Sequence, residues 1–212
     1  MSDITYRKIR RADYNQIQQI INQSFGLYKY VKHPKVLKSL LQLYLQSCLS
    51  EQTFNCVAEK DGKVIGVIMG QAKSEYGYLK HIVSILSMAF YFIKMNVQSQ
   101  LYQCNTTDFK RIHEIYHQFL KGRKHEFDGV LTLFAVTEEC RGFGVGKTLL
   151  HHLLEHLKKQ NTHNIYLYTD SSCNYGFYEN LGFIRLCEYS LKITSEKQRT
   201  TLDVFLYGYS IT

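Results

Sequence analysis

One stretch of the sequence carries most of the information about the fold: Leu131-Thr132-Leu133-Phe134-Ala135-Val136-Thr137-Glu138-Glu139-Cys140-Arg141-Gly142-Phe143-Gly144-Val145-Gly146-Lys147. Its apolar beginning predicts a buried strand over residues 130–136. Three glycines then stand at every second position, and a helix pattern starts at Lys147 and continues to about Gln160. A strand, a glycine-rich turn and a helix therefore follow in direct succession.

A turn of this composition favours an anionic ligand. The first N–H groups of a helix have no partner within the helix and lie at the positive end of its dipole. Glycines permit a positive φ and leave no Cβ between those groups and a ligand. A phosphate or pyrophosphate fits such a turn, and Arg141 adds a charge-assisted contact.

Two common phosphate-binding motifs do not match. Walker A requires four residues between its first glycine and the glycine before the lysine, whereas three residues separate Gly142 from Gly146. The dinucleotide motif G-x-G-x-x-G fails because residues 142–146 read G-x-G-x-G. The turn also lies deep in the chain and not in a first βαβ unit.

Periodicity outside this stretch predicts alternating strands and helices. Strands are expected over residues 4–9, 54–59, 64–70, 165–169, 183–191 and 202–211, the second and third forming a hairpin through Asp61-Gly62. Helices are expected after Asp13, from Pro34 to Cys48 and over residues 175–180. We expect a single mixed α/β domain over residues 1–212, with a central sheet flanked by helices.

Residues from about 72 to 128 interrupt this alternation. They contain an uncharged, largely apolar run, His81 to Ile93, that is too short to span a bilayer, which takes about 20 residues. We expect a buried helix there and no stable membrane insertion. A second helix pattern, capped by Thr107 or Asp108 and stopped by Gly122, has an apolar inner side made of Phe109, Ile112, Ile115, Tyr116, Phe119 and Leu120.

The glycine turn resembles the Arg/Gln-x-x-Gly-x-Gly/Ala signature of the GCN5-related N-acetyltransferase (GNAT) superfamily. The triplet Phe134-Ala135-Val136 ends a strand five residues before the arginine, as in that family. A later segment, Phe177-Tyr178-Glu179-Asn180-Leu181-Gly182-Phe183, is similar to the family's aromatic-Tyr-x-x-x-Gly-Phe. The resemblance covers most of the chain outside residues 72–128. It implies a GNAT-like acyl-CoA N-acyltransferase fold, with a mostly antiparallel central sheet and a helical insertion.

The resemblance also implies an activity: transfer of an acetyl group from acetyl-CoA, the co-substrate, to a primary amine by direct attack, without a metal. By carry-over, Phe134, Ala135 and Val136 line the pantetheine arm, and the N–H of Val136 polarises the thioester carbonyl. Tyr178 corresponds to the general acid that protonates the departing thiolate, the alternative being a core tyrosine. The phosphates are expected on Arg141, Gly142, Phe143, Gly144, Val145, Gly146 and Lys147.

Two parts of this site depart from the family or stay open. Many relatives have an asparagine seven residues before the tyrosine, where this chain has Ser171, with Asn174 as a substitute one turn away. Tyr166 stands where some relatives have a glutamate. The general base is therefore open among Glu126, Asp128, Glu138 and Asp170. Cys140 and Cys173 suggest an acyl-cysteine route, but neither has a histidine at a diagnostic spacing, so direct attack is the simpler expectation.

His152-Leu153-Leu154-Glu155-His156 matches the H-x-x-E-H pattern of one class of zinc peptidases. The two histidines share a helix face, but they fall at the edge of the stripe formed by Leu149, Leu153 and Leu157 and are expected to turn toward solvent. We therefore expect the phosphate-loop helix here and no metal.

The composition limits the remaining functions. The 26 basic and 18 acidic residues give a net charge of +8, which favours anionic partners, but no nucleic-acid-binding motif is present and we expect no nucleic-acid partner. Six irregularly spaced cysteines and no signal peptide predict free thiols and a cytoplasmic protein. The alternative to an enzyme is a non-catalytic acyl-CoA-binding or sensing module on the same fold.

The acceptor is expected to be a small-molecule or peptide amine. The groove that the resemblance implies is aromatic and basic, with Phe25, Tyr28, Lys29, Tyr30 and Lys32, which favours a neutral or acidic acceptor over a strongly cationic one. We expect the helix pair of residues 72–128 to cover the acceptor side of the active site. Some apolar surface should remain for the substrate or for a second chain, as in a homodimer.

Overall fold

The computed structural model describes residues 3–75, 77–104, 106–195 and 198–211. Seven strands form one sheet in the order β1-β2-β3-β4-β5-β7-β6. All neighbouring strands are antiparallel except β4 and β5, which are parallel. The strands are β1 (Thr5–Arg7), β2 (Phe54–Lys60), β3 (Lys63–Ala72), β4 (Gly129–Val136), β5 (Asn164–Asp170), β6 (Ile184–Ser195) and β7 (Gln198–Ser210).

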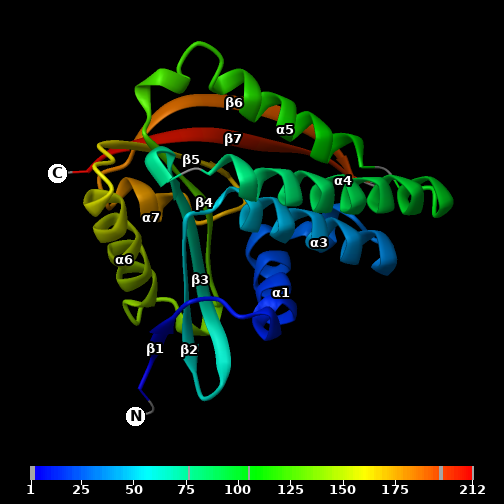
Figure 1. Ribbon diagram of the computed structural model, residues 1–212. Coiled ribbons are helices and arrows are strands. Elements are labelled where there is room, and N and C mark those ends of the chain that lie inside the picture. Colours follow the sequence, from blue (N-terminus) through cyan, green and yellow to red (C-terminus); the bar gives the residue numbers. More distant parts are fainter. Residues whose placement is uncertain (1–2, 76, 105, 196–197, 212) are drawn as a thin grey trace.

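Helices flank the sheet, so the expected mixed α/β fold with a mostly antiparallel sheet is confirmed. Figure 1 shows β1 to β4 running down the molecule while β6 and β7 cross above them, because the sheet is strongly twisted. The helices are α1 (Tyr14–Phe25), α2 (Leu27–Tyr30), α3 (Pro34–Glu51), α4 (Tyr78–Leu101), α5 (Thr107–Phe119), α6 (Val145–Lys159) and α7 (Gly176–Glu179).

The two central parallel strands separate soon after they begin. β4 and β5 pair at Gly129 with Ile165 and at Val130 with Tyr166, and then diverge. On their other sides both strands remain paired, β4 with β3 and β5 with β7 along its full length. The divergence therefore leaves one edge of β4 unpaired over residues 131–136; we call the region between the two diverging strands the cleft.

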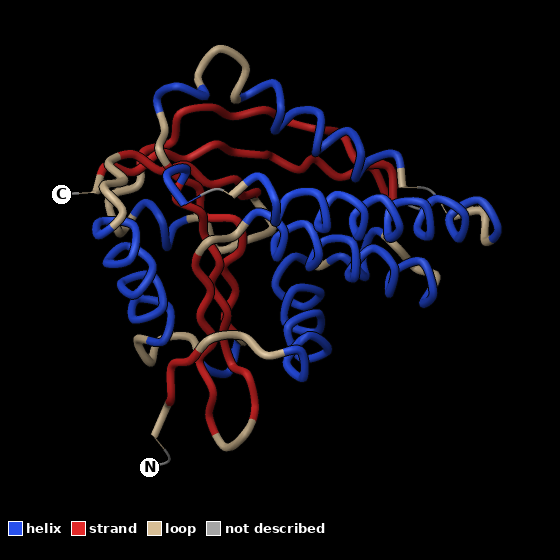
Figure 2. The backbone as a smooth tube through the Cα atoms, in the orientation of Figure 1, coloured by secondary structure: helices blue, strands red, loops and turns tan. Residues whose placement is uncertain are grey.

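Each face of the sheet has its own core. Under α6, Leu149 and Leu153 pack with β-strand residues such as Ile68 and Leu167. On the opposite face, Ile17 of α1 and other residues of α1 and α3 cover the alternate residues of β2, β3 and β4. Figure 2 shows α6 on one side of the strands and α1 and α3 on the other.

Short-range sequence signals explain several turns. Asp61 and Gly62 join β2 to β3 with φ values of 52° and 73°, the two positive φ values that a type I′ hairpin turn requires. Gly26 ends α1 with a φ of 60°. Asp13 precedes α1 as expected, but its carboxylate bonds Arg7 and the N–H of Arg10.

The segment between β3 and β4 contains the two expected helices, but they do not lie as one pair on the core. α5 packs on β6 and β7, where Ile115 meets Leu191 and Val204. α4 packs on α3, with Met95 buried beside Leu40.

The prediction that the apolar run forms a buried helix is wrong for its described part. α4 is longer than predicted, and its large apolar side chains exposed by half or more are Leu86, Phe90, Phe92, Ile93, Val97 and Leu101. The side chains of residues 78–85, which include Ile82, Val83 and Ile85, lie outside the described residues. In the described part of the chain, no helix is both long and apolar enough to cross a membrane.

Candidate active site

The glycine turn forms a cradle of backbone N–H groups at the start of α6. Gly142 and Gly144 have φ values of 86° and 78°, and a Cβ built on either would meet nothing within 4 Å. The first backbone hydrogen bond of the helix runs from the N–H of Thr148 to the carbonyl of Gly144, so the N–H groups of residues 145–147 precede the helical ladder. Gly144 caps the helix without a side-chain hydrogen bond.

The glycine turn also carries two basic side chains, Arg141 and Lys147, and a third glycine, Gly146. Arg141 and Lys147 are exposed, and one guanidinium nitrogen of Arg141 lies 3.3 Å from the carboxylate of Glu138. Gly146 has ordinary helical geometry, but its missing Cβ would lie 3.3 Å from Phe134 and 3.4 Å from Phe177. Gly146 therefore permits close packing of two aromatic rings, whereas Gly142 and Gly144 permit the left-handed backbone.

The open edge of β4 presents backbone groups to the cleft. Thr137 donates its N–H to the carbonyl of Ile65 on β3, and the β3–β4 register continues through Ala135 with Val67. Because hydrogen-bonded and non-hydrogen-bonded pairs alternate in an antiparallel ladder, the backbone groups of Phe134 and Val136 point away from β3. They face the cleft, where the resemblance requires an oxyanion donor and pantetheine contacts.

Tyr178 lies across the cleft from this edge. Its ring centroid is 6.2 Å from that of Phe134 on β4, and 5.5 Å from that of Phe183. The residue is 8% exposed. Burial, and to a smaller degree the neighbouring Cys173, raises the pKa of the phenol above its usual value, so the group stays protonated at neutral pH.

A group of polar residues, three of them tyrosines, lies at the open end of β5, on the side of α1 and α3. We call this group the tyrosine cluster; it consists of Tyr30, Tyr44, Tyr116, Asp170 and Cys173. Its members come from α2, α3, α5, β5 and the loop after β5. Burial, above all, raises the pKa of Tyr30, Tyr44 and Tyr116, and the charge of Asp170 adds to the effect on Tyr30 and Tyr116. Tyr44 also interacts electrostatically with Cys173 and Tyr178, so the cluster adjoins Tyr178.

The sequence did not predict that these five residues lie close together. Tyr116 and Tyr44 were expected only as members of apolar helix stripes, and the helices that carry them are separated by β2, β3 and α4. The structure fixes their positions through contacts with neighbours: Tyr116 stacks on Tyr168 at 4.3 Å, and Tyr44 lies 5.7 Å from Phe25.

The two residues expected to hold the pantetheine amides are placed differently. Ser171 is exposed, and its hydroxyl accepts the backbone N–H of Asp203 at 3.0 Å, which joins it to β7. Asn174 is exposed, and its backbone carbonyl accepts the N–H of Phe177 at the start of α7. The acceptor capacity of the Ser171 hydroxyl is therefore partly used within the protein.

The four acidic candidates for the general base occupy different places. Glu126 pairs with Arg123, Asp128 accepts the N–H groups of His163 and Asn164 where β5 begins, and Glu138 pairs with Arg141 beside the glycine turn. Asp170 alone among the four belongs to the tyrosine cluster. Its carboxylate accepts the N–H of Ser172 at 2.8 Å and the hydroxyl of Ser172 at 2.5 Å.

The H-x-x-E-H histidines interact with the edge of the sheet. A ring nitrogen of His156 lies 2.8 Å from a carboxylate oxygen of Glu75, and the ring lies 4.9 Å from that of Phe54. His152 contacts the ring of Tyr6. Within the described ranges, no three His, Cys, Asp or Glu side chains are arranged to hold a metal ion.

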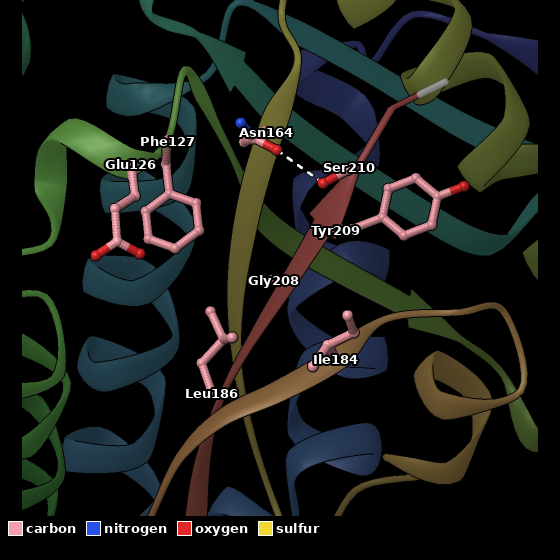
Figure 3. A pocket seen from close by; sticks show the side chains of 8 residues that line it. All are labelled: Glu126, Phe127, Asn164, Ile184, Leu186, Gly208, Tyr209 and Ser210. Carbon is pink, nitrogen blue, oxygen red and sulfur yellow. Dashed lines mark hydrogen bonds between the residues drawn. The ribbon is translucent and has the colours of Figure 1, made fainter.

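Two hollows lie outside the cleft. The larger, about 260 Å³, is at the beginning of β5, and Figure 3 shows its lining: Glu126, Phe127, Asn164, Ile184, Leu186, Gly208, Tyr209 and Ser210. The seven residues of β5 separate it from Asp170 by about 20 Å. The smaller, about 160 Å³, lies beside the start of α6 and is lined by Lys147, Leu150, His151, Leu154, Leu181, Phe183 and Tyr209.

Comparisons with known proteins agree with this geometry. A model of the acetyltransferase (GNAT) family matches residues 101–183, a segment that contains β4, the glycine turn, β5 and Tyr178. The resemblance to this family that the sequence shows is therefore confirmed over residues 101–183. A search among curated proteins finds no match.

Solved structures show the same fold along nearly the whole chain. The ribosomal-protein-S18-alanine N-acetyltransferase of Escherichia coli aligns with a TM-score of 0.53 at 15% identity, over 99% of this chain and 95% of that one. An N-acetyltransferase of Staphylococcus aureus Mu50 aligns with a TM-score of 0.54 at 15% identity, over 100% of both. A putative acetyltransferase of Salmonella typhimurium, solved with its cofactor acetyl-CoA, aligns with a TM-score of 0.55 at 14% identity, over 99% and 94%.

Proposed function

We propose that this protein is an N-acetyltransferase that moves an acetyl group from acetyl-CoA to a primary amine by direct attack. The observation that carries the proposal is the combination of the cleft between β4 and β5 with the uncapped start of α6 at its mouth. The cleft offers an unpaired strand edge for an amide-bearing arm, and the helix start offers N–H groups for phosphates. Tyr178 lies across that cleft from Phe134.

In this proposal, described residues take up acetyl-CoA from its nucleotide end to its thioester. The N–H groups of residues 142–147 would hold the pyrophosphate, with Arg141 and Lys147 as nearby cations. The hollow beside Lys147 offers aromatic walls, Phe183 and Tyr209 stacked at 4.5 Å, for the adenosine part. Phe134, Ala135 and Val136 would line the pantetheine arm. Ser171, whose hydroxyl already accepts the N–H of Asp203 on β7, and Asn174 would add contacts to the arm.

The reaction needs a donor for the thioester oxygen, a base for the amine and an acid for the sulfur. The N–H of Val136 donates to the carbonyl oxygen and stabilises the negative charge that develops when nitrogen attacks the carbonyl carbon. Asp170 accepts the proton that the attacking amine loses, directly or through a water. Tyr178 gives its proton to the sulfur as the C–S bond breaks, and its raised pKa keeps that proton available at neutral pH.

The tyrosine cluster is the proposed acceptor site. Asp170 supplies its carboxylate, which would attract the amine end of the acceptor. Lys29 and Lys32 are exposed on either side of Tyr30 in the sequence, and they favour an acceptor that is neutral or acidic apart from its amine. A small molecule or a peptide end that carries a primary amine and an acidic group meets both conditions.

The test is a turnover screen in which acetyl-CoA is incubated with a panel of amines and the released thiol is measured. We expect turnover with at least one neutral or acidic amine. Asp170→Asn should keep the dissociation constant for CoA and lower kcat by about 10²-fold, the usual range for a lost base. Glu138→Gln is the matched control and should keep kcat. Binding of CoA with no thiol released from any amine would instead indicate a non-catalytic acyl-CoA-binding module.

A further inference from the structure

α4 carries an apolar ridge on the side opposite its contact with the domain. The ridge consists of Leu86, Phe90, Ile93, Val97 and Leu101, which are 57% to 69% exposed. At 3.6 residues per turn these five side chains fall within a sector of about 80°. Met95, which is 1% exposed and packs on α3, lies on the opposite side of the helix.

The contacts of α4 with α3 explain why the ridge faces outward. Met95 packs with Val36 and Leu40, and the hydroxyl of Ser39 lies 2.5 Å from the side-chain oxygen of Gln98. The ammonium group of Lys94 donates a hydrogen bond to the side-chain oxygen of Gln42 at 3.0 Å. These interactions fix the rotation of α4 about its axis and leave the ridge without a partner among the described residues.

The ridge has the form of a helix-pairing seam. Its spacing of 4, 3 and 4 residues from Leu86 to Val97 is that of a and d positions in a coiled coil, and the stripe extends about 22 Å along the helix. A seam this narrow is complementary to one other helix. A helix lying on a bilayer would instead combine a broad apolar face with a basic polar face.

The absence of charge on the ridge favours one kind of partner over another. Between Leu86 and Leu101 the only charged residue is Lys94, and its ammonium is directed to α3. The chain as a whole carries a net charge of +8, so two copies repel each other over most orientations. An uncharged seam is a surface on which like-charged copies can meet, whereas it offers no cation of its own to an anionic membrane.

The area and the symmetry also suit a second copy. With about 150–200 Å² for each large apolar side chain, five side chains exposed by about two thirds present roughly 500–650 Å² per copy. Interfaces of standard size bury about 800 Å² per partner, which the flanking polar residues of α4 would complete. The ridge is nearly symmetric about Ile93, so an antiparallel pair sets Leu86 against Leu101 and Phe90 against Val97 of the other copy.

We infer that two copies of this chain associate through α4, packed antiparallel about a twofold axis near Ile93. The buried surface is the ridge, and the same five residues of each copy form both sides of the interface. The inference does not depend on the proposed function, because the ridge lies on the face of α4 opposite α3 and contains no residue of the candidate active site.

The test is the mass in solution, measured by sedimentation equilibrium between about 1 and 100 µM. We expect the wild-type chain to reach twice its monomer mass within this range. Phe90→Lys with Ile93→Lys should raise the dissociation constant of the dimer by about 100-fold or more, since four ammonium groups would enter an apolar seam. Both side chains are exposed, so the fold should be retained, which circular dichroism checks.

Phe92→Lys is the matched control. Phe92 is 50% exposed on the same helix but lies about 140° around the axis from the middle of the ridge, so its replacement should leave the dimer intact. A wild-type chain that stays monomeric at 100 µM would overturn the inference. So would equal effects of the ridge and control variants, or a monomer that sediments with vesicles containing phosphatidylserine through the ridge.

Discussion

Replacing Gly144 with alanine tests the phosphate cradle most directly. Gly144 has a φ of 78°, and its added Cβ would meet nothing within 4 Å, so the change creates strain without a clash in the free protein. A non-glycine residue in the left-handed region costs about 1–2 kcal/mol. The free energy of unfolding should fall by that amount, which corresponds to a decrease in Tm of roughly 2–8 °C for a chain of this size.

The effect on binding should be larger than this strain explains. The strain is present in both the free and the bound protein and largely cancels in the dissociation constant. The methyl group, however, would occupy the approach to the helix N–H groups. Loss of one hydrogen bond to a charged phosphate is worth about 1.5–3 kcal/mol, so the dissociation constant for CoA should rise roughly 10- to 150-fold in isothermal titration calorimetry.

Gly62→Ala provides the control for strain alone. Gly62 has a φ of 73° and also has no atom within 4 Å of its added Cβ, but it lies at the hairpin tip between β2 and β3. It should lose similar stability and bind CoA with the wild-type dissociation constant. Wild-type affinity in Gly144→Ala would refute the cradle, and equal loss of affinity in both variants would assign the effect to general destabilisation.

Two further predictions concern the tyrosines of the cleft and of β5. Tyr178→Phe should keep CoA binding and lower kcat by about 10²-fold in the thiol-release assay, and an unchanged kcat would make Tyr178 structural. Burial raises the pKa of Tyr166 to about 12, whereas an unfolded tyrosine titrates near 10, so the stabilisation is complete below pH 10 and is lost as the pH rises toward 12. Urea unfolding of Tyr166→Phe should therefore show a pH dependence weaker by up to about 1.4 kcal/mol per pH unit in this window, and an unaltered slope would contradict it.

Local signals in the sequence predicted the local features of the site. Asp61-Gly62 indicated the hairpin, and the glycines at 142 and 144 indicated a turn whose left-handed backbone the structure contains. The tyrosine cluster could not be predicted in the same way, because Tyr44 and Tyr116 lie on helices separated in the sequence by β2, β3 and α4 and come near each other only in the folded chain. An apolar stripe predicts that a side chain is covered but not which side chain covers it.

α4 shows that an apolar sequence also does not reveal which side of a helix stays exposed. Its sequence is apolar nearly all round, which indicates that more than one surface is covered, yet α3 covers only the side around Met95. β6 and β7 also extend beyond their predicted ends, to Ser195 and from Gln198. Polar residues such as Lys192 and Thr201 obscured the strands there, and α5 stabilises them by covering Ile193 and Leu202.

The segment between β3 and β4 has a structural role that bears on the cleft. β5 loses β4 as a neighbour after Tyr166, so the part of β5 that ends at Asp170 has no strand on that side. α5 interacts with this part instead: the hydroxyl of Tyr168 donates to the backbone carbonyl of Tyr116 at 2.8 Å, and the two rings stack. The hydroxyl of Tyr116 in turn lies 3.5 Å from the backbone carbonyl of Thr169.

Through these contacts, α5 and β7 together flank the part of β5 that has diverged from β4. Removing the whole segment would uncover Leu191, Val204 and the α3 surface around Leu40 as well as release the free part of β5. Loss of activity in such a deletion would therefore report on folding as much as on the acceptor site. Single changes separate these roles, because the ridge of α4 points away from α3 whereas Tyr116 of α5 contacts β5. The same inserted segment thus contacts the free part of β5 through α5 and exposes an apolar seam on α4.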